Sequence, residues 1–540
     1  MAAPSYEDCC ARFRWDDVLD ALGWRGRAAV NLGETLVDRH AAHDAARIAL
    51  RWVGADGARR DVSFGALARE TSRFADWLAA TGIAKGDRVA VVMPRLPETV
   101  AILLGTWKAG AVYVPIFAGF GADAIRHRVN DSGARVICTH ASLRDKIDGP
   151  FPHAPVILSV GGARAGDVAY EDALAGRRAA FAPVPCARED AAALIYTSGS
   201  TGPPKGVAIA TNLVAAIWPA MRYGADLQPD DVFWPTGDPG WGYGLVCYAV
   251  ALAMAVPVTM WEALPGAESA LAFMAEHGVT NLATVPTLLR GIMALGVDRV
   301  RGAGVAVRRI ASCGEPLNAE VVRFFRDAWG VTPMDQFGSS EQGLPCGNLA
   351  ATSMDVKPGS MGRAMPGHRV AVIDESGSEL PPDRVGLIAV APAPDGTYAL
   401  DYWNRAPSAP SFRRGPWIVT GDLGRRDAAD YFWFEGRNDD VIKSAGYRIG
   451  PFEVESAILT HRDVAEAAVV GKPDALRGQI VKAFVVLKPG AATRDGLAEE
   501  IVAAVRRQVG AHQYPREIEF VADLPKTTTG KIQRFRLRER

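Results

Sequence analysis

The feature that most constrains this fold is a long alternation of short β-branched runs with amphipathic segments. Runs rich in valine and isoleucine occur at residues 88–93, 111–115, 135–138 and 155–158, separated by segments such as 96–109. Alternating strands and helices form β-α units, so the pattern predicts a layered α/β body with largely parallel sheets. Residues 269–285 and 318–337 repeat it, each as a helix followed by a strand.

The pattern changes after residue 370. Strands expected at 370–374, 386–390, 417–420 and 431–434 are joined by turns, which predicts a small antiparallel β-barrel or sheet. Beyond Arg437 the order is strand, helix 451–460, strands 464–470 and 481–487, helix 494–509 and strand 517–521, an α+β arrangement. We therefore expect a large N-terminal domain at 1–437 and a small C-terminal domain at 438–540, joined by the polar segment 436–440.

Length and charge exclude several classes of protein. A chain of 540 residues is too long for one hydrophobic core, and its net charge of −1 provides no overall basic field for nucleic acid or anionic membranes. Phosphate binding must therefore be local. Seven cysteines without a C-x-x-C pair indicate neither a disulfide framework nor a zinc ribbon, which favours a reducing, cytoplasmic setting. The first ten residues contain acidic side chains and lack the apolar core of a signal peptide.

One uncharged stretch needs a separate interpretation. The twenty-three residues between Asp238 and Glu262 carry no charge, and a segment of this length is sufficient to cross a bilayer of about 30 Å. The stretch also contains five helix-breaking glycines and prolines, and only 245–255 is an uninterrupted apolar run. We expect a buried helix there, followed by a strand at 256–261, and no membrane span.

The segment YTSGSTGPPKGV at residues 196–207 has the composition of an anion-binding loop. Its glycines allow backbone N–H groups to converge on an oxyanion, its hydroxyls donate to phosphate oxygens, and Lys205 adds a positive charge. The segment is not a P-loop, because Pro204 precedes the lysine and Gly206 follows it. It comes directly after the apolar run 191–195, so we expect it to follow a strand.

This loop resembles the phosphate loop of adenylate-forming enzymes, the superfamily of acyl-CoA synthetases, peptide-synthetase adenylation domains and luciferases. Further similar segments follow in the family's order: SCGEPL at 312–317, DQFGSSE at 335–341, TGDLG at 420–424, GRNDDVIKSAGYRIG at 436–450 and PKTTTGKIQR at 525–534. WPTGDPGWGYG at 234–244 and QYPR at 513–516 are most similar to short- and medium-chain acyl-CoA synthetases. The resemblance implies an AMP-binding body and a small, mobile C-terminal lid.

The resemblance also implies an ATP/AMP site. Taken singly, each of three residues has an ordinary structural explanation. Asp422 could form an Asx turn, Glu341 could begin a solvated helix, and Phe337 could belong to the core. The nucleotide residues implied together are Thr197, Ser198, Gly199, Ser200, Thr201, Gly202, Lys205, Gly314, Glu315, Pro316, Asp335, Gln336, Phe337, Gly338, Ser339, Ser340, Asp422, Arg437 and Arg448.

The implied reaction has two half-reactions and uses ATP, Mg²⁺ and coenzyme A. A carboxylate first attacks the α-phosphorus of ATP, and the coenzyme A thiolate then displaces AMP. Lys531, Glu341 and Thr197 are the implied catalytic residues, with Glu341 at Mg²⁺. His461 stands where some short-chain members have a further Mg²⁺ contact, although a lone histidine carries little signal. Asp439 resembles the hinge of the lid, and Gly446 the wall of the coenzyme A channel.

The implied acyl pocket contains Trp241, Gly242, Tyr243, Cys313 and Gly338. Acetate-specific members have a tryptophan where this chain has Gly338, so we expect an open pocket. Because each buried methylene is worth about 0.8 kcal/mol, such a pocket favours straight or branched acids of about four to ten carbons. A histidine that many members carry after the phosphate loop is absent from AIATNL at 208–213.

Four alternatives stay open: an aromatic-acid CoA ligase, a ligase that loads a carrier protein, a luciferase-like oxygenase and a non-catalytic nucleotide-binding protein. The expected partners are small molecules and exclude nucleic acid. The sequence leaves open whether the protein is a monomer or a dimer.

Overall fold

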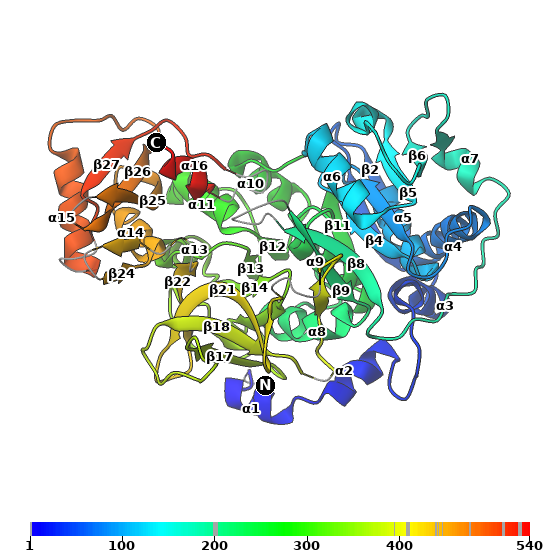
Figure 1. Cartoon of the computed structure of the whole chain (residues 1–540), viewed down its shortest axis with the longest axis horizontal. Helices are drawn as coiled ribbons and strands as arrows, with labels where there is room; N and C mark the ends of the chain where they lie inside the picture. Colours follow the sequence, from blue (N-terminus) through cyan, green and yellow to red (C-terminus); the bar gives the residue numbers. More distant parts are fainter. Residues whose placement is uncertain are drawn as a thin grey trace.

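The computed structural model of the chain describes residues 3–197, 204–393, 395–406, 411–437, 440, 442–444, 447–474, 477–509, 514–526 and 532–540. Figure 1 shows two large sheets with their helices, a third sheet below them, and a C-terminal unit at the opposite end from β5 and β6. The arrangement is mixed α/β, as the alternation of strands and helices predicts.

The first sheet has eight strands in the order β19-β9-β8-β4-β3-β5-β6-β7. The strands from β8 to β7 pair in parallel, whereas β9 and β19 add antiparallel at one edge. Their bounds are Arg88–Val92 (β3), Val112–Pro115 (β4), Val136–His140 (β5), Val156–Val160 (β6), Val168–Ala169 (β7), Ala191–Thr197 (β8), Lys205–Ala210 (β9) and Ala399–Tyr402 (β19). The helices that follow these strands or precede the sheet are Phe64–Ala80 (α4), Pro97–Lys108 (α5), Ala122–Ser132 (α6) and Tyr170–Leu174 (α7).

The second sheet has nine strands in the order β16-β15-β14-β13-β12-β10-β11-β1-β2, parallel from β14 to β1 and antiparallel at both edges. Its strands are Ile48–Val53 (β1), Arg59–Ser63 (β2), Phe233–Pro235 (β10), Val258–Trp261 (β11), Asn281–Thr284 (β12), Arg309–Cys313 (β13), Pro333–Ser339 (β14), Gly343–Gly347 (β15) and Arg363–Ala364 (β16). The helices of this part are Leu213–Pro219 (α8), Gly242–Ala253 (α9), Ala267–Glu276 (α10), Pro286–Ala294 (α11), Val297–Arg301 (α12) and Ala319–Trp329 (α13). Before β1 come Tyr6–Arg12 (α1), Trp15–Leu22 (α2) and Arg39–His43 (α3).

Local sequence explains where the helices begin and end. In α13, Val321, Val322 and Phe325 face the core at helical spacing, and Gly330 ends the helix with a φ of 68° that favours glycine. Helix α5 begins with Pro97, whose missing N–H needs no partner in the first turn. These boundaries lie within one or two residues of those predicted from periodicity.

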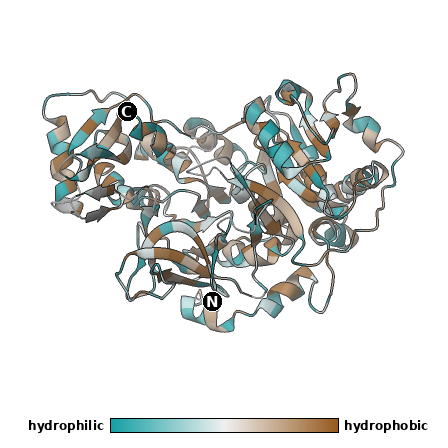
Figure 2. Ribbon diagram, in the orientation of Figure 1, coloured by the Kyte–Doolittle hydropathy of each residue, from teal (hydrophilic) through white to brown (hydrophobic). Residues whose placement is uncertain are grey.

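The uncharged stretch forms a buried helix and a strand. Helix α9 has apolar residues on every side, and its residues from Gly244 to Ala253 are buried. A helix that is hydrophobic all round packs inside a large core, and α9 belongs to the cluster that joins both large sheets. None of the described helices has the length and apolarity needed to cross a membrane. Figure 2 shows hydrophobic residues along the strands and hydrophilic residues on the peripheral helices.

The third sheet is open, which corrects the prediction of a small β-barrel. Strands Arg369–Ile373 (β17), Gly386–Ala391 (β18), Trp417–Arg426 (β21) and Arg413–Arg414 (β20) follow one another, and Phe432–Arg437 (β22) pairs with β21. In the part of the chain that the structure describes, β17 pairs with β18 alone, so the sheet does not close. The alternating pattern of these strands fits either form, because it specifies one buried face and not closure.

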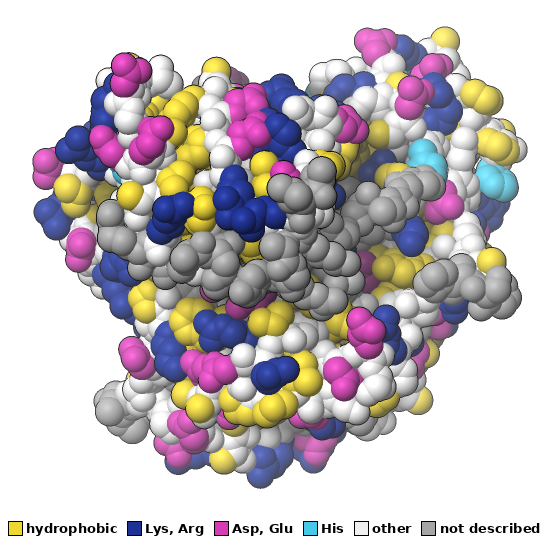
Figure 3. All heavy atoms as spheres, turned by 60° about the vertical axis from the view of Figure 1, so that its left-hand side comes forward, with side chains coloured by type: hydrophobic (Ala, Val, Ile, Leu, Met, Phe, Trp, Pro, Cys, Tyr) yellow, Lys and Arg dark blue, Asp and Glu magenta, His cyan; other side chains and the backbone are white. Residues whose placement is uncertain are grey.

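The C-terminal unit has the predicted α+β arrangement, and its sheet has five strands where four were expected, because the segment after Arg437 forms two short strands. Its order is β24-β23-β26-β25, with β27 parallel to β26. The strands are Ile442–Ser444 (β23), Tyr447–Ile449 (β24), Val464–Asp474 (β25), Gly478–Leu487 (β26) and Glu517–Phe520 (β27), and the helices are Pro451–Ile458 (α14), Leu497–Val509 (α15) and Arg534–Arg538 (α16). It has a hydrophobic cluster of its own. Charges of both signs are interspersed over the described part of the face in Figure 3, in keeping with the net charge of −1.

Candidate active site

The predicted phosphate loop connects the two strands of a β-hairpin. Strand β8 ends at Thr197, β9 begins at Lys205, and these two residues form the last pair of the ladder. The Thr197 hydroxyl donates to the Lys205 carbonyl over 3.4 Å. The prediction that the loop follows a strand directly is therefore confirmed. The other predicted phosphate residues lie outside the described residues: Ser198, Gly199, Ser200, Thr201 and Gly202.

Strand β14 carries most of the segment 335–341, and Glu341 follows it in the turn to β15. The Glu341 carboxylate is buried and accepts a hydrogen bond of 3.2 Å from the hydroxyl of Tyr402. Burial raises the pKa of Glu341, and the charge of Asp422 raises it further. Burial also raises the pKa of Asp335, on the same strand, to about 8. Two buried carboxyl groups thus occupy the segment predicted to bind nucleotide.

Asp422 lies on β21, opposite Arg437 of β22. Its carboxylate accepts hydrogen bonds from the Thr420 hydroxyl at 2.5 Å and from the Arg437 guanidinium at 3.5 Å. Asp422 is buried, and it is close enough to Glu341 to affect that residue's pKa. The structure therefore brings together Glu341 from the β14–β15 turn, Asp422 from β21 and Arg437 from β22. The side chain of Arg448 lies outside the described part of the chain.

The segment 312–317 extends from the end of β13. Gly314 has a φ of 99°, a conformation that side chains rarely adopt. The Glu315 carboxylate accepts hydrogen bonds from the Thr287 hydroxyl at 2.8 Å and from Arg290 at 2.5 Å. Its side chain is thus held by α11, and Pro316 follows it in the turn to α13. Glu315 thus holds this predicted nucleotide segment against α11.

The predicted acyl residues gather at the start of α9. Trp241 precedes the helix, and its ring lies 5.5 Å from the ring centroids of Phe117 and Phe120. The Tyr243 hydroxyl donates to Gln336 of β14 over 3.3 Å. Burial raises the pKa of Tyr243, and Cys313 is close enough to contribute to the shift. A methyl group built on Gly242 would contact Ile195 at 3.5 Å and Ser340 at 3.8 Å.

Gly338 differs from Gly242. A Cβ atom on Gly338 would lie 1.8 Å from the carbonyl oxygen of Gly343, because the β14–β15 ladder has an irregularity between Phe337 and Ser339. The absence of a side chain at this position is therefore required by the neighbouring strand. A tryptophan there needs a different course of β15, and the backbone as well as the residue type sets the shape of the pocket.

Comparisons with known proteins identify the family. A family described as "AMP-binding enzyme" matches residues 37–397, more than half of the chain, and its "AMP-binding enzyme C-terminal domain" matches residues 453–531. The chain belongs to the AMP-binding enzyme family. An acetyl-coenzyme A synthetase of Bacillus subtilis is 36% identical over 98% of this chain and 94% of its own length.

Solved structures agree with this assignment. An acyl-CoA synthetase of Brucella canis is 38% identical with a TM-score of 0.78, over 99% of this chain and 98% of its own. A benzoate CoA ligase of Burkholderia xenovorans is 28% identical with a TM-score of 0.83, over 94% of this chain and 100% of its own. The predicted superfamily, and with it the class of AMP-forming acyl-CoA synthetases, is confirmed. ATP and coenzyme A are the expected co-substrates of a ligase of this class.

The C-terminal unit of this AMP-binding enzyme contacts the body next to the predicted nucleotide segment 312–317. Asn318, next to segment 312–317, donates to the Ser456 hydroxyl of α14 over 2.9 Å, and the rings of Phe434 and Phe452 lie 6.2 Å apart. His461 lies within the unit itself, 3.6 Å from Glu500. The described residues contain no group of three metal-ligating side chains. Lys531, Asp439 and Gly446 lie outside the described residues.

Sequence reasoning missed Tyr402. Its hydroxyl bonds Glu341, and the Lys205 ammonium lies 5.3 Å from its ring centroid. A lone tyrosine at the end of a short strand carries no sequence signal for such a position. Only the pairing of β19 with β9 brings it to the site.

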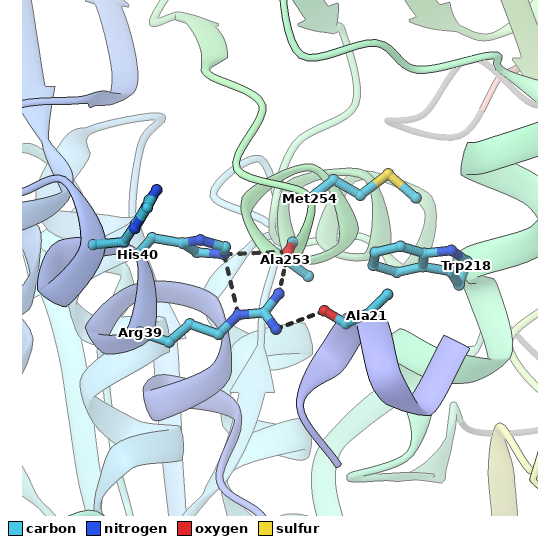
Figure 4. Close-up of a pocket in the computed structure, with 7 residues that line it drawn as sticks. Ala21, Arg39, His40, Trp218, Ala253 and Met254 are labelled. Atoms are coloured by element: carbon cyan, nitrogen blue, oxygen red, sulfur yellow. Dashed lines mark hydrogen bonds between the residues drawn. The ribbon is translucent and has the colours of Figure 1, made fainter. Parts of the chain in front are cut away.

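A separate cavity of about 370 Å³ lies at the far end of α9, between α3, α8 and the end of α2 (Figure 4). Helix α9 has 12 residues, about 18 Å, so this cavity is well separated from Trp241 at the other end. Arg39 donates to the carbonyl oxygens of Ala21 at 2.7 Å and Ala253 at 2.5 Å. The guanidinium thus satisfies the last carbonyl groups of two helices, which is a structural role.

Proposed function

We propose that this acyl-CoA synthetase activates a straight or branched carboxylic acid of about four to ten carbons. This range is expected because an apolar pocket gains about 0.8 kcal/mol for each methylene that it buries. The observation that carries the proposal is the convergence of Glu341, Asp422 and Arg437 beside the ends of the phosphate-loop hairpin. Within one site, these residues offer carboxylates for a divalent cation and for ribose hydroxyls, and a guanidinium beside them.

In the first half-reaction, a carboxylate oxygen of the acid attacks the α-phosphorus of ATP and pyrophosphate leaves. Thr197 and Lys205 would bind the β- and γ-phosphates, together with residues 198–202. Asp422 would accept hydrogen bonds from the ribose hydroxyls, for which its two carboxylate oxygens are suited. Lys531 would bring its ammonium group to the carboxylate and α-phosphate oxygens, screening the two anions that must meet.

The donor set also suits a divalent cation. Glu341 is a buried carboxylate with a raised pKa and a second carboxylate nearby, and a bound cation would relieve that repulsion. Glu341 would hold Mg²⁺, which would neutralise charge on the phosphates. His461 would be a second contact only in an arrangement that frees it from Glu500.

In the second half-reaction, the thiolate of coenzyme A attacks the carbonyl carbon of the acyl-adenylate and AMP leaves. The C-terminal domain, residues 438–540, would turn relative to residues 1–437 about Asp439, and Gly446 would then line the channel for pantetheine. A glycine suits a narrow channel because a side chain would obstruct it. The seven free cysteines support a reducing setting such as the cytoplasm.

The acyl group would lie against Trp241, Tyr243 and Cys313. Gly242 leaves room between α9, Ile195 and Ser340, which favours chains longer than acetate. An aromatic acid is a second candidate, because the benzoate CoA ligase has the same fold over nearly its whole length.

The test is a panel of acids in the ATP–pyrophosphate exchange reaction, followed by formation of the CoA ester. Acetate, butyrate, isobutyrate, hexanoate, octanoate and benzoate cover the alternatives. We expect kcat/KM to be at least about tenfold higher for the best four- to ten-carbon acid than for acetate, the discrimination of two buried methylenes. Acetate as the preferred acid would contradict the proposal, and benzoate as the preferred acid would favour the aromatic alternative.

The Lys531→Ala variant serves as the mechanistic control in the same experiment. It should lose acyl-adenylate formation and keep transfer from pre-formed acyl-adenylate to coenzyme A. Equal loss of both steps would contradict the role given to Lys531. Transfer to a phosphopantetheinylated carrier protein in preference to free coenzyme A would favour the carrier-loading ligase.

A further inference from the structure

We propose that Tyr402 is a positioning residue for adenylation, which holds Glu341 and Lys205 apart and in place for ATP; this inference rests on the proposed function. The side chain contacts one group predicted to bind a cation and one predicted to bind phosphate. Neither comparison with known proteins nor the sequence pattern assigns it a role.

The position of Tyr402 results from strand pairing. Strand β19 adds antiparallel to β9, and Tyr402 pairs with Val207. Val207 is two residues after Lys205, at the start of the strand that leaves the phosphate loop. The ring of Tyr402 packs edge-on against Phe412, with centroids 5.1 Å apart. The tyrosine is therefore fixed from two sides before any substrate binds.

Its hydroxyl acts on Glu341. The 3.2 Å hydrogen bond from the phenol favours the ionised form of the buried carboxylate. The phenol must be the donor in this contact, because an ionised carboxylate can only accept hydrogen bonds. Without this donor, the buried carboxylate would lose a partner that stabilises the charge needed for a cation.

Its ring acts on Lys205. The ammonium lies 5.3 Å from the ring centroid, within the range of a cation–π contact, while the lysine itself stays exposed. Within the part of the chain that the structure describes, no ion pair joins Lys205 to Glu341. The tyrosine therefore contacts both charges without letting them neutralise each other. Lys205 stays available for phosphate, and Glu341 for a cation.

The experiment separates the two contacts with two variants. Tyr402→Phe keeps the ring and removes the hydroxyl, whereas Tyr402→Leu removes both. The matched control is Tyr170→Phe, since Tyr170 donates to the half-buried Glu70 over 2.7 Å in another part of the molecule. Pyrophosphate exchange is measured against ATP and Mg²⁺ concentration, and ester formation is measured separately from pre-formed acyl-adenylate.

We expect Tyr402→Phe to lower kcat/KM for exchange by about tenfold, the effect of one hydrogen bond to a charged group, and to raise the Mg²⁺ concentration for half-maximal rate several-fold. Tyr402→Leu should in addition raise the KM for ATP. Transfer from pre-formed adenylate should change by less than about twofold in all variants, because neither contact is used there. Tyr170→Phe should match the parent protein in every kinetic assay.

The positioning role would be overturned by an unchanged Mg²⁺ dependence in Tyr402→Phe, or by equal loss of both half-reactions. If Tyr402→Leu does not fold, as judged by its melting temperature, Tyr402→Phe alone decides. A parent protein without exchange activity on any acid overturns the proposed function and this inference with it. An active parent with an unaffected Tyr402→Phe overturns this inference alone.

Discussion

At the scale of single residues, two glycines of the proposed acyl pocket differ in what a methyl group would meet. At Gly242 the nearest atom to an added Cβ is Ile195 at 3.5 Å, an ordinary contact. At Gly338 it is the Gly343 carbonyl oxygen at 1.8 Å, which forces the backbone to move. The same substitution should therefore narrow the pocket at one position and damage the fold at the other.

We predict that Gly242→Ala folds normally and shifts preference toward shorter acids, with the kcat/KM ratio of octanoate to butyrate falling about tenfold, the cost of one or two lost methylene contacts. Gly338→Ala should lower the free energy of unfolding by about 1–3 kcal/mol, as overpacking does. Chemical denaturation measures the change in the free energy of unfolding, and the acid panel measures the change in acid preference. Equal stability of the two variants, or an unchanged acid preference in Gly242→Ala, would contradict this assignment.

At the scale of elements, a buried ion pair connects three parts of the body. Arg95, between β3 and α5, donates to Asp238 over 3.3 Å, and both side chains are 8% exposed. The Arg95 guanidinium also donates to the carbonyl of Ala263 after β11, and the backbone carbonyl of Arg95 accepts from the Trp52 indole on β1. Asp238 lies in the turn just before Trp241 and α9. The start of α9 is thus tied to both large sheets.

We predict that Arg95→Met lowers the free energy of unfolding by about 3–5 kcal/mol, because it leaves a buried carboxylate without its partner. The control is Arg59→Met, which breaks the exposed Arg59–Glu276 pair between β2 and α10. An exposed pair contributes about 0–1 kcal/mol. Urea unfolding at neutral pH measures both variants, and similar losses would mean that the buried pair has no special role.

Periodicity predicted most elements, and long-range pairing explains what it missed. Segments such as 96–109 and 318–329 became α5 and α13 because their apolar spacing is local information. The pairing of β19 with β9 joins residues about two hundred positions apart, and no local pattern specifies it. The open form of the third sheet was likewise not encoded in its alternation, since a barrel and a sheet bury the same face.

The same division between local pattern and long-range contact applies to the residues of the candidate site. Thr197, Glu341 and Asp422 were predicted because they belong to segments with a recognisable order. The structure places Thr197 at the end of β8, Glu341 in the turn after β14 and Asp422 within β21. Tyr402 was missed because its role depends on two contacts with distant residues. The requirement for glycine at 338 was also hidden, because it comes from the course of β15 and not from residue 338 itself.

At the scale of the whole molecule, one carboxyl group makes the docking of the C-terminal unit depend on pH. Glu435 of β22 is 12% exposed, and Glu453 of α14 lies near it. Burial and the charge of Glu453 raise the pKa of Glu435 to about 7, although Arg425 donates to it over 3.2 Å and opposes the shift. Near neutral pH, the docked arrangement therefore binds a proton that separated units would release.

The sign of the effect follows from the raised pKa. The carboxyl group of Glu435 has an ordinary pKa of 4.5 when it is exposed and a pKa of about 7 when the unit is docked. Its contribution therefore favours docking most below pH 4.5. That contribution is lost as the pH rises from 4.5 through 7. We predict that Glu435→Gln, which is neutral at every pH, is more stable than the parent at pH 8 by about 1–3 kcal/mol, with the difference shrinking toward pH 5.

Calorimetric melting between pH 5 and 8.5 measures this difference, with Glu276→Gln as a control on an exposed carboxylate. A difference that does not change with pH would contradict the prediction. Helix α14 contacts β22 in this structure, and the proposed mechanism rotates the C-terminal unit between the half-reactions. We predict that the same variant slows this rotation. At pH 8, Glu435→Gln should then lower the overall rate of ester formation more than the rate of pyrophosphate exchange, since in that mechanism only ester formation needs both arrangements.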